Sequence, residues 1–555
     1  MTISKYLRAA AILLALSLGL TMRADSKPDA DKTKDAKPDS PAKAETKVEE
    51  EPVLSVTAHT VTVDGKVIKY HVTAGYMIQK EEEGKPLLKD SEGPPPAPAA
   101  EKDDADKPKD GLKAKAKIFF VAYTLDDVTD LSKRPVTYCF NGGPGSASIW
   151  LHMGAIGPRR ANLTPDGEAP APPYQIADNE STWLDRTDLV FIDPVSTGFS
   201  RPMPKEGAGQ FHGVREDLAS VGDFIRLYTT RNGRWLSPKF VVGESYGTFR
   251  AAGLSDYLQT RYGLYLNGIV LVSSVLNFQA IGFSPENDEP YIGFLPSYAT
   301  AAWYHKKLSP EMEAKGVDQV ASEARAFAAT DYALALGKGD AATAEERQRI
   351  ADQLSHFTGI PASKFKLLRL RLPDTMFFDH LLMEEGRYVG RYDARFTGLS
   401  YSPGQSTDDE YDPSYEAVSP VFNAALNDYV RRELKFESDI PYEALFHVSP
   451  WNFGDPADGP PNTAEDLRRA MTRNPYLKLW VVCGYYDLAT PFFGAERVVA
   501  SMNLDPSIRA NLRFTYYESG HMVYIHAPSR AKFKADFLAF LGDATSQPVV
   551  NAAAR

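Results

Sequence analysis

The stretch Val241-Val242-Gly243-Glu244-Ser245-Tyr246-Gly247 decides the fold class of this chain. A short apolar strand runs into Gly-x-Ser-x-Gly, and the residues that follow, Thr248–Gln259, are expected to form a helix. In that setting the pattern predicts a nucleophile elbow, a tight strand-to-helix turn that lifts a serine hydroxyl clear of the backbone. The alternative is an ordinary glycine turn with a surface serine, so the rest of the chain has to supply the partners of Ser245.

Strand-like and helix-like segments alternate on both sides of this turn. A helix is expected at Gly213–Tyr228, where apolar residues recur at helical spacing, and another at Ala531–Leu541. Because parallel strands need crossover connections, the alternation predicts an α/β fold with a mostly parallel central sheet flanked by helices. The expected strands are a hairpin at Val53–Met77 turning at Asp64-Gly65, then Lys117–Tyr123, Pro135–Phe140, Thr187–Ile192, Phe240–Val242, Asn267–Val275, Leu477–Cys483 and Arg513–Tyr517.

Composition divides the chain of 555 residues into segments of different character. Segments rich in Lys, Asp, Glu and Pro cannot bury enough apolar surface to fold, whereas the region between the two parts of the sheet has helical patterns. The expected organisation is a signal peptide at 1–24, a disordered charged linker at 25–52, a first core part at 53–283 with a low-complexity loop insertion at 80–116, a helical lid insertion at 284–465, a second core part at 466–543 and a flexible tail at 544–555.

The N-terminus has the character of an export signal. Lys5 and Arg8 precede the apolar run Ala9–Leu20, whose length suits a signal peptide and is short for a membrane span. An uncleaved anchor is the alternative. We expect cleavage near Ala24, export to the periplasm or the extracellular space, and no stable membrane association afterwards.

The overall charge and the cysteine count exclude several classes of protein. The net charge of −11 argues against nucleic-acid binding, which needs a basic surface. Two cysteines, Cys139 and Cys483, are not a disulfide framework. The chain contains no CxxC, HExxH or Asp-rich calcium loop, so we expect no metal site and no cofactor. No pattern indicates the oligomeric state.

A nucleophilic serine needs a base and an orienting carboxylate. His521 follows a predicted strand through a glycine-containing turn, which is where the base of an α/β hydrolase lies. Asp487 follows the strand before it, and the order Ser245, Asp487, His521 is that of this fold. The alternatives are a core histidine and an aspartate that caps a turn.

An oxyanion hole is expected from the loop Asn141-Gly142-Gly143-Pro144-Gly145, which directly follows a predicted strand. Adjacent glycines allow a backbone N–H to point at the substrate, and the second donor is the N–H after the nucleophile. The hole is therefore assigned to Gly143 and Tyr246. A bare glycine-rich turn is the alternative.

These motifs together resemble the serine carboxypeptidase family, peptidase family S10. They occur in the family's order from about Pro135 to Met522, and the glycine loop and Gly-Glu-Ser-Tyr-Gly are the most specific of them. The resemblance rests on Phe140 to Ser146, Asp193 to Ser200, Gly243 to Gly247, Gly484 to Asp487 and Gly520 to Met522.

The resemblance implies an α/β-hydrolase fold and removal of C-terminal residues from peptide substrates, favoured at acidic pH. It also implies that Asn141 and Glu244 bind the terminal carboxylate of the substrate. A protonated Glu244 can share a hydrogen bond with a carboxylate, whereas an ionised one repels it.

Three positions depart from the family pattern. Cys139 replaces a Trp, Ser146 replaces a Cys, and Ala155 replaces a second Glu. The loss at Ala155 weakens carboxylate recognition and keeps open an esterase or acyltransferase with the same triad. A non-catalytic binding protein is a third alternative, against which the complete triad argues.

In an α/β-hydrolase sheet the strands of Cys139 and Cys483 lie about three positions apart. At about 4.8 Å per strand the separation is roughly 14 Å, about twice the reach of a disulfide. We therefore expect two free, buried thiols.

Overall fold

The computed structural model describes residues 53–82, 112–401, 411–445 and 448–546. The expected signal peptide, the charged linker, most of the expected loop insertion and the last nine residues of the tail lie outside these ranges. Within them, no helix combines the length and the apolar character that crossing a membrane requires.

The described residues form one large mixed sheet of ten strands. Strands β7, β4, β9, β10, β13 and β14 are parallel to one another, whereas β1, β2 and β3 extend the sheet in antiparallel fashion. The spatial order is β1 (Leu54–Val63), β2 (Lys66–Glu82), β3 (Leu112–Leu125), β7 (Asp188–Ile192), β4 (Val136–Phe140), β9 (Lys239–Ser245), β10 (Gly268–Ser274), β13 (Lys478–Gly484) and β14 (Leu512–Tyr517), with β8 (Arg201–Pro202) paired to β3. The mostly parallel sheet predicted from the sequence is confirmed.

The two antiparallel hairpins at the edge are partly as expected. β1 and β2 meet at Asp64 and Gly65, which both have positive φ, as predicted for a tight turn. The loop insertion predicted at 80–116 is wrong at both of its ends. Strand β2 continues to Glu82 and β3 begins at Leu112, because the two segments continue to pair beyond a register shift between Gln79 and Lys80. The charged side chains there belong to a ribbon, where backbone pairing rather than apolar burial holds the strands together.

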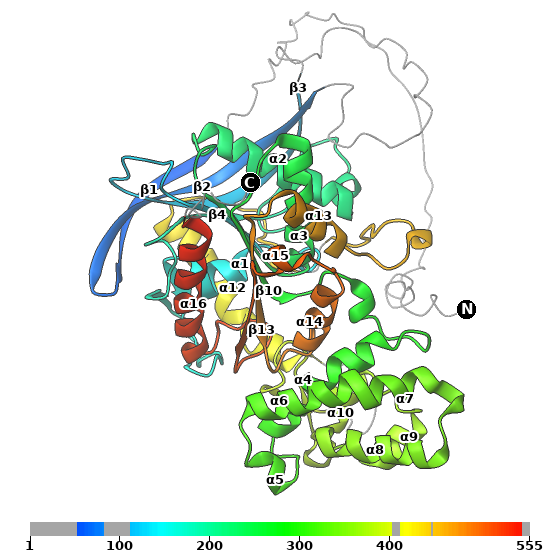
Figure 1. Ribbon diagram of the computed structural model, residues 1–555. Helices are drawn as coiled ribbons and strands as arrows, with labels where there is room; N and C mark the ends of the chain where they lie inside the picture. The colour runs from blue at the N-terminus through cyan, green and yellow to red at the C-terminus, as the bar shows by residue number, and fades with distance from the viewer. Residues whose placement is uncertain (1–52, 83–111, 402–410, 446–447, 547–555) are drawn as a thin grey trace, which may run out of the picture. The chain divides into compact units, whose positions relative to one another are not determined.

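Helices cover both faces of the sheet (Figure 1). Alternate residues of each central strand point to opposite faces, so Leu479 and Val481 of β13 join one apolar cluster and Trp480 and Val482 join the other. The first face packs on α2 (Val214–Arg231), α3 (Tyr246–Tyr262), α4 (Glu289–Tyr304), α13 (Ala464–Arg473) and α14 (Phe492–Ala500), and the second on α1 (Ile149–Leu151), α12 (Ser419–Asp428) and the closing helix α16 (Ala527–Thr545). This two-layered helical cover on a mostly parallel sheet is the α/β-hydrolase fold.

The region between β10 and β13 is predominantly helical. Its helices between Pro310 and His380 gather below α4 and α14 in Figure 1. The segment Pro310–Leu336 is not one continuous helix, because Gly316 takes an extended backbone before the next helix begins. The remaining elements there are α5 (Pro310–Glu313), α6 (Val317–Phe327), α7 (Ala333–Lys338), α8 (Ala344–Thr358), α9 (Ala362–Leu367), α10 (Asp374–His380), β11 (Arg387–Val389), β12 (Thr397–Leu399) and α11 (Pro413–Glu416).

Outside that region a few short elements accompany the large sheet without belonging to it. A π-helical turn at His152–Ile156 follows α1 directly. The short strands β5 (Arg159–Ala161) and β6 (Ile176–Asp178) form a separate pair, and α15 (Pro506–Arg509) precedes β14.

The two cysteines lie where the strand order predicts. Cys139 is on β4 and Cys483 is on β13, with β9 and β10 between them. Both are buried free thiols, as expected from the sequence.

Candidate active site

Ser245 lies at the junction of β9 and α3, in a strained turn. Its backbone angles are φ 59° and ψ −129°, which a non-glycine residue rarely adopts. A β-carbon at Gly243 would come within 2.0 Å of the carbonyl oxygen of Gly247, so the chain can cross itself here only with glycine. The Gly-x-Ser-x-Gly pattern thus forms the sharp turn that the sequence predicts, with Ser245 partly exposed at its tip.

His521 and Asp487 are brought together by the loops after β14 and β13. The Nδ1 atom of His521 lies 2.9 Å from Oδ2 of Asp487. The other carboxylate oxygen of Asp487 accepts hydrogen bonds from the backbone N–H groups of Ala489 and Thr490, at 2.8 and 2.9 Å. These contacts orient the Asp487 carboxylate to accept a hydrogen bond from a protonated Nδ1 of His521. The other ring nitrogen, Nε2, then carries no proton and can act as the base.

The electrostatic balance at His521 favours a basic imidazole. Complete burial by itself lowers the pKa of His521, but the neighbouring Asp487 carboxylate and its hydrogen bond outweigh burial, so the pKa is raised. Glu244 also acts to raise it, while Arg391 acts to lower it. The raised pKa means that these surroundings stabilise the imidazolium, which is the form that appears when a histidine takes a proton from a nucleophile.

The position of His521 is fixed through its own backbone. Its N–H donates to the carbonyl of Tyr392 at 2.6 Å, and its carbonyl accepts from the hydroxyl of Ser273 at 2.6 Å. The preceding Gly520 donates to Asp393 at 2.8 Å. The end of β10 and the segment after β11 therefore hold the loop that carries the imidazole.

The glycine loop after β4 packs directly on the elbow. A β-carbon at Gly142 would lie 2.3 Å from the backbone nitrogen of Tyr246, so only glycine permits this approach. The carbonyl of Asn141 accepts from Arg250 at 2.6 Å, and Arg250 is paired with Asp217 at 2.7 Å. This buried pair joins α2 and α3 to the loop that contains Gly143.

A second anchor holds the far end of the glycine loop. The carboxylate of Asp193, at the end of β7, accepts from both the N–H and the hydroxyl of Ser148, at 2.8 and 2.7 Å. Burial raises the pKa of Asp193 to about 6. The first residue of the Asp193 to Ser200 motif therefore fixes Ser148, just after the predicted oxyanion loop, through these two hydrogen bonds.

Glu244 is a buried carboxyl group beside the predicted nucleophile. Burial raises its pKa to about 7, although His521 and hydrogen bonds from Tyr524 and Asn141 act to lower it. The Tyr524 hydroxyl donates to Oε2 of Glu244 at 2.6 Å. Below about pH 7 this group is neutral and can donate as well as accept.

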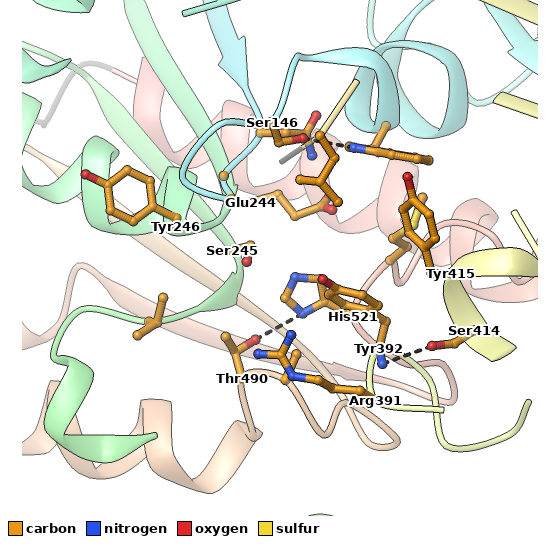
Figure 2. Close-up of a pocket in the computed structure, with 18 of the residues that line it drawn as sticks. Ser146, Glu244, Ser245, Tyr246, Arg391, Tyr392, Ser414, Tyr415, Thr490 and His521 are labelled. Atoms are coloured by element: carbon orange, nitrogen blue, oxygen red, sulfur yellow. Dashed lines mark hydrogen bonds between the residues drawn. The ribbon is translucent and has the colours of Figure 1, made fainter. Parts of the chain in front are cut away.

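One pocket contains nearly all the predicted site residues. Figure 2 shows Ser245 facing His521, with Glu244 directed toward the side on which Ser146 and Tyr415 lie. Asn141, Gly143 and Tyr246 also line this pocket, and Asp487 is fully buried behind His521. The apolar part of the wall consists of Trp150, Val275, Phe278, Ile281, Val418, Leu445 and Met522.

The insertion contributes to the pocket through the short helix α11 and neighbouring loops rather than through α5 to α10. Arg391, Tyr392, Ser414, Tyr415 and Val418 line it. In the described part of the chain, the lining includes no residue of α5 to α10.

Three residues of the site were missed from the sequence. The hydroxyl of Thr490 lies 2.8 Å from Oδ2 of Asp487 and 3.1 Å from Nδ1 of His521. The ring of Tyr392 lies 5.4 Å from that of His521. Thr490 could have been inferred from its place three residues after Asp487, and Tyr524 from its place three residues after His521; no local pattern indicates Tyr392.

The three departures from the family pattern have clear structural settings. Cys139 is completely buried in β4. The hydroxyl of Ser146 accepts from Nε1 of Trp150 at 2.9 Å, so it fixes an indole of the pocket wall. Ala155 is buried in the π-helical turn, with a side chain too short to reach a substrate.

Comparisons with known proteins give the family of this chain. A family model described as serine carboxypeptidase matches residues 110–524. The pheromone-processing carboxypeptidase KEX1 of Saccharomyces cerevisiae is 35% identical over 135 residues, which are 23% of this chain and only 17% of that protein. A crystal structure of a KEX1 prohormone-processing carboxypeptidase from that yeast is 16% identical, covers 86% of this chain and 92% of its own, and has a TM-score of 0.48. A proline iminopeptidase of Mycobacterium smegmatis is 13% identical over 77% of this chain and 95% of its own, with a TM-score of 0.33. Since the family model covers well over half of the chain, this protein belongs to the serine carboxypeptidase family, peptidase family S10.

Proposed function

We propose that this protein is a serine-type carboxypeptidase that removes C-terminal residues from peptides through an acyl-enzyme. The observation that carries the proposal is one pocket lined by Ser245, His521 and the buried carboxyl of Glu244. The first two residues supply acyl-transfer chemistry, and the third supplies a reason for the enzyme to act only at the end of a chain.

In the proposed reaction the Ser245 hydroxyl attacks the carbonyl carbon of the last peptide bond, and Nε2 of His521 takes its proton. Asp487 holds the imidazole in the required tautomer and stabilises the imidazolium. The backbone N–H groups of Gly143 and Tyr246 bind the oxyanion, and each such donor contributes about 10²–10³ in rate. His521 then returns the proton to the leaving amine, and water releases the acyl group.

The proposed recognition of the chain end uses Asn141 and Glu244. A neutral Glu244 donates a hydrogen bond to the terminal carboxylate of the substrate, and its raised pKa of about 7 keeps it neutral over the acidic range. This supports activity favoured at acidic pH. The loop residues Arg391, Tyr392 and Tyr415 form the proposed cover of the substrate pocket.

We further propose that the protein is exported to the periplasm or the extracellular space. The basic and apolar residues at Lys5, Arg8 and Ala9–Leu20 support a cleaved signal peptide. Recovery of the protein from the cytoplasm alone would contradict export, and an N-terminus intact at Met1 would contradict cleavage.

The decisive experiment compares matched peptides that have a free or an amidated C-terminus. We expect release of the last residue from the free peptide and turnover at least tenfold slower for the amide, since Glu244 then lacks its carboxylate partner. Labelling by a fluorophosphonate, lost in Ser245→Ala, reports the nucleophile separately, and no labelling of the unsubstituted protein would indicate a non-catalytic binding protein.

A second candidate function is favoured by one observation, the buried Ala155 at the place where a second Glu is expected. An esterase or acyltransferase with the same triad would use small acyl compounds and would not distinguish the free from the amidated peptide. Equal turnover of the two peptides, together with faster turnover of short acyl esters, would establish it in place of the carboxypeptidase.

A further inference from the structure

Tyr524 is a buried residue of the site to which the reaction above assigns no role. It lies three residues after His521, in the loop between β14 and α16, and is completely inaccessible to solvent. Its hydroxyl donates to Oε2 of Glu244 at 2.6 Å, and the amide of Asn141 bonds to the same hydroxyl. Tyr524 therefore contacts both residues proposed to bind the terminal carboxylate.

The π-helical turn at His152–Ile156 leaves space for this ring. A β-carbon at Gly154 would come within 2.6 Å of Cε2 of Tyr524, so the tyrosine packs against the turn only because residue 154 is glycine. The adjacent Ala155 is buried in the same turn and has no polar side-chain atom. The polar partner of Glu244 thus comes from the loop after His521 and not from this turn.

We propose that Tyr524 is a positioning residue for recognition of the substrate's C-terminal carboxylate, holding the carboxyl group of Glu244 in place of the acidic partner that Ala155 cannot provide. This inference rests on the proposed carboxypeptidase function. It assigns a specificity role to a side chain that does not itself line the described pocket.

A tyrosine partner differs chemically from a carboxyl partner. Two carboxyl groups in contact share one proton, and each raises the pKa of the other. Burial and Glu244 raise the pKa of Tyr524 well above its ordinary value, so its hydroxyl stays a donor throughout the working range. Donation by Tyr524 lowers the pKa of Glu244 relative to the burial effect alone. Glu244 then has a fixed hydrogen-bond donor on one oxygen, and it shares no proton with that partner.

The other groups that act on Glu244 are few. His521, from the loop after β14, lowers its pKa; Asp487, from the loop after β13, raises it; and the amide of Asn141, from the loop after β4, lowers it. Because these groups remain in a Tyr524→Phe variant, a shift of the Glu244 titration in that variant measures the tyrosine hydroxyl.

The test is Tyr524→Phe, which keeps the ring and removes only the hydroxyl. For the free-acid peptide we expect KM to increase about tenfold with little change in kcat, as for loss of one hydrogen bond to a binding group. We expect turnover of the amidated peptide and the rate of fluorophosphonate labelling to stay unchanged. In the pH profile of activity on the free-acid peptide, the decline at alkaline pH (the alkaline limb) should move to higher pH. The reason is that the Tyr524 hydroxyl, which favours ionised Glu244, is gone.

Tyr332→Phe is the matched control, since the buried Tyr332 hydroxyl donates to the carbonyl of Leu370 at 2.7 Å within the helical insertion. It should change neither KM nor the alkaline limb. If Tyr524→Phe lowers turnover of both peptides equally and leaves the limb in place, the tyrosine is only structural and the inference is overturned. If the unsubstituted protein does not distinguish the two peptides, the proposed function itself fails and the inference falls with it.

Discussion

Nδ1 of His521 lies 2.9 Å from Oδ2 of Asp487, and both side chains are almost fully buried. Because Asp487 also accepts two backbone hydrogen bonds at its other oxygen, the carboxylate has a fixed orientation before any substrate arrives. The same contact explains why the pKa of His521 is raised in spite of burial.

Asp487→Asn tests whether the Asp487 carboxylate holds His521 in the tautomer that the reaction needs. The amide would stabilise the wrong tautomer of His521, and we expect kcat to fall by about 10⁴. Steady-state kinetics on the free-acid peptide measures this. Asp505→Asn is the control, because Asp505 is an exposed residue whose carboxylate caps α15. A loss of less than tenfold in Asp487→Asn would remove Asp487 from the triad.

Glu244→Gln should abolish the rise of KM that we expect as the pH increases through about 7. Below about pH 7 Glu244 is neutral and donates to the terminal carboxylate; as the pH rises through about 7 it ionises and repels the substrate, so KM rises. A glutamine amide donates without titrating, so its KM should stay flat between about pH 5 and pH 9. An unchanged rise of KM in the variant would assign the limb to another group.

Gly142→Ala should damage the oxyanion loop. The new methyl group would lie 2.3 Å from the nitrogen of Tyr246 and 2.7 Å from that of Gly247, and both are backbone atoms that cannot rotate away. We expect kcat to fall by about 10²–10³ as one oxyanion donor is displaced. Gly207→Ala, where nothing lies within 4 Å of the new carbon, should have normal kinetics. Normal kinetics in both variants would place the oxyanion hole elsewhere.

Arg250→Met should destabilise the protein through the helix pair behind the glycine loop. It leaves the buried Asp217 carboxylate and the carbonyl of Asn141 without their shared donor, and we expect a loss of about 3–5 kcal/mol in the free energy of unfolding. Urea denaturation measures the loss. Arg432→Met, which breaks an exposed pair with Asp428, should leave the urea midpoint nearly unchanged. Similar values for the two variants would contradict this account.

Thiol titration should find two reactive groups only after denaturation. Cys139 and Cys483 are buried on strands separated by two others, and burial raises the pKa of both thiols well above the ordinary value. The native protein should therefore react slowly with a thiol reagent, and the denatured protein should bind two equivalents. A denatured protein without free thiols would require a disulfide that this strand order does not allow.

Much of the core was predictable because its signals are local. The alternation of apolar runs and helical spacing predicted the central strands β4, β7, β9, β10, β13 and β14, and Gly243 and Gly247 marked the elbow. The ends of β2 and β3 were not predictable, since Lys80–Glu82 form a strand only through pairing with Leu112–Ala114. Composition alone cannot reveal a backbone partner that lies thirty residues away.

The same distinction between local signals and long-range packing applies to the residues of the candidate active site. Ser245, Asp487 and His521 each follow a strand in the order that the fold requires, so a search for strand ends finds them. Tyr392 is absent from any such pattern, because its contact with His521 depends on how separate loops pack over the edge of the sheet.

The sequence by itself was enough to propose the chemistry: a candidate nucleophile on a strained turn, a candidate base and acid, and a glycine loop, each recognisable because local backbone geometry demands particular residues. Only the tertiary structure decided how Glu244 is held. Tyr524 reaches it across a sequence separation of 280 residues, through the space that Gly154 leaves open. Such a contact has no period or motif, because it is set by the packing of side chains from distant parts of the chain.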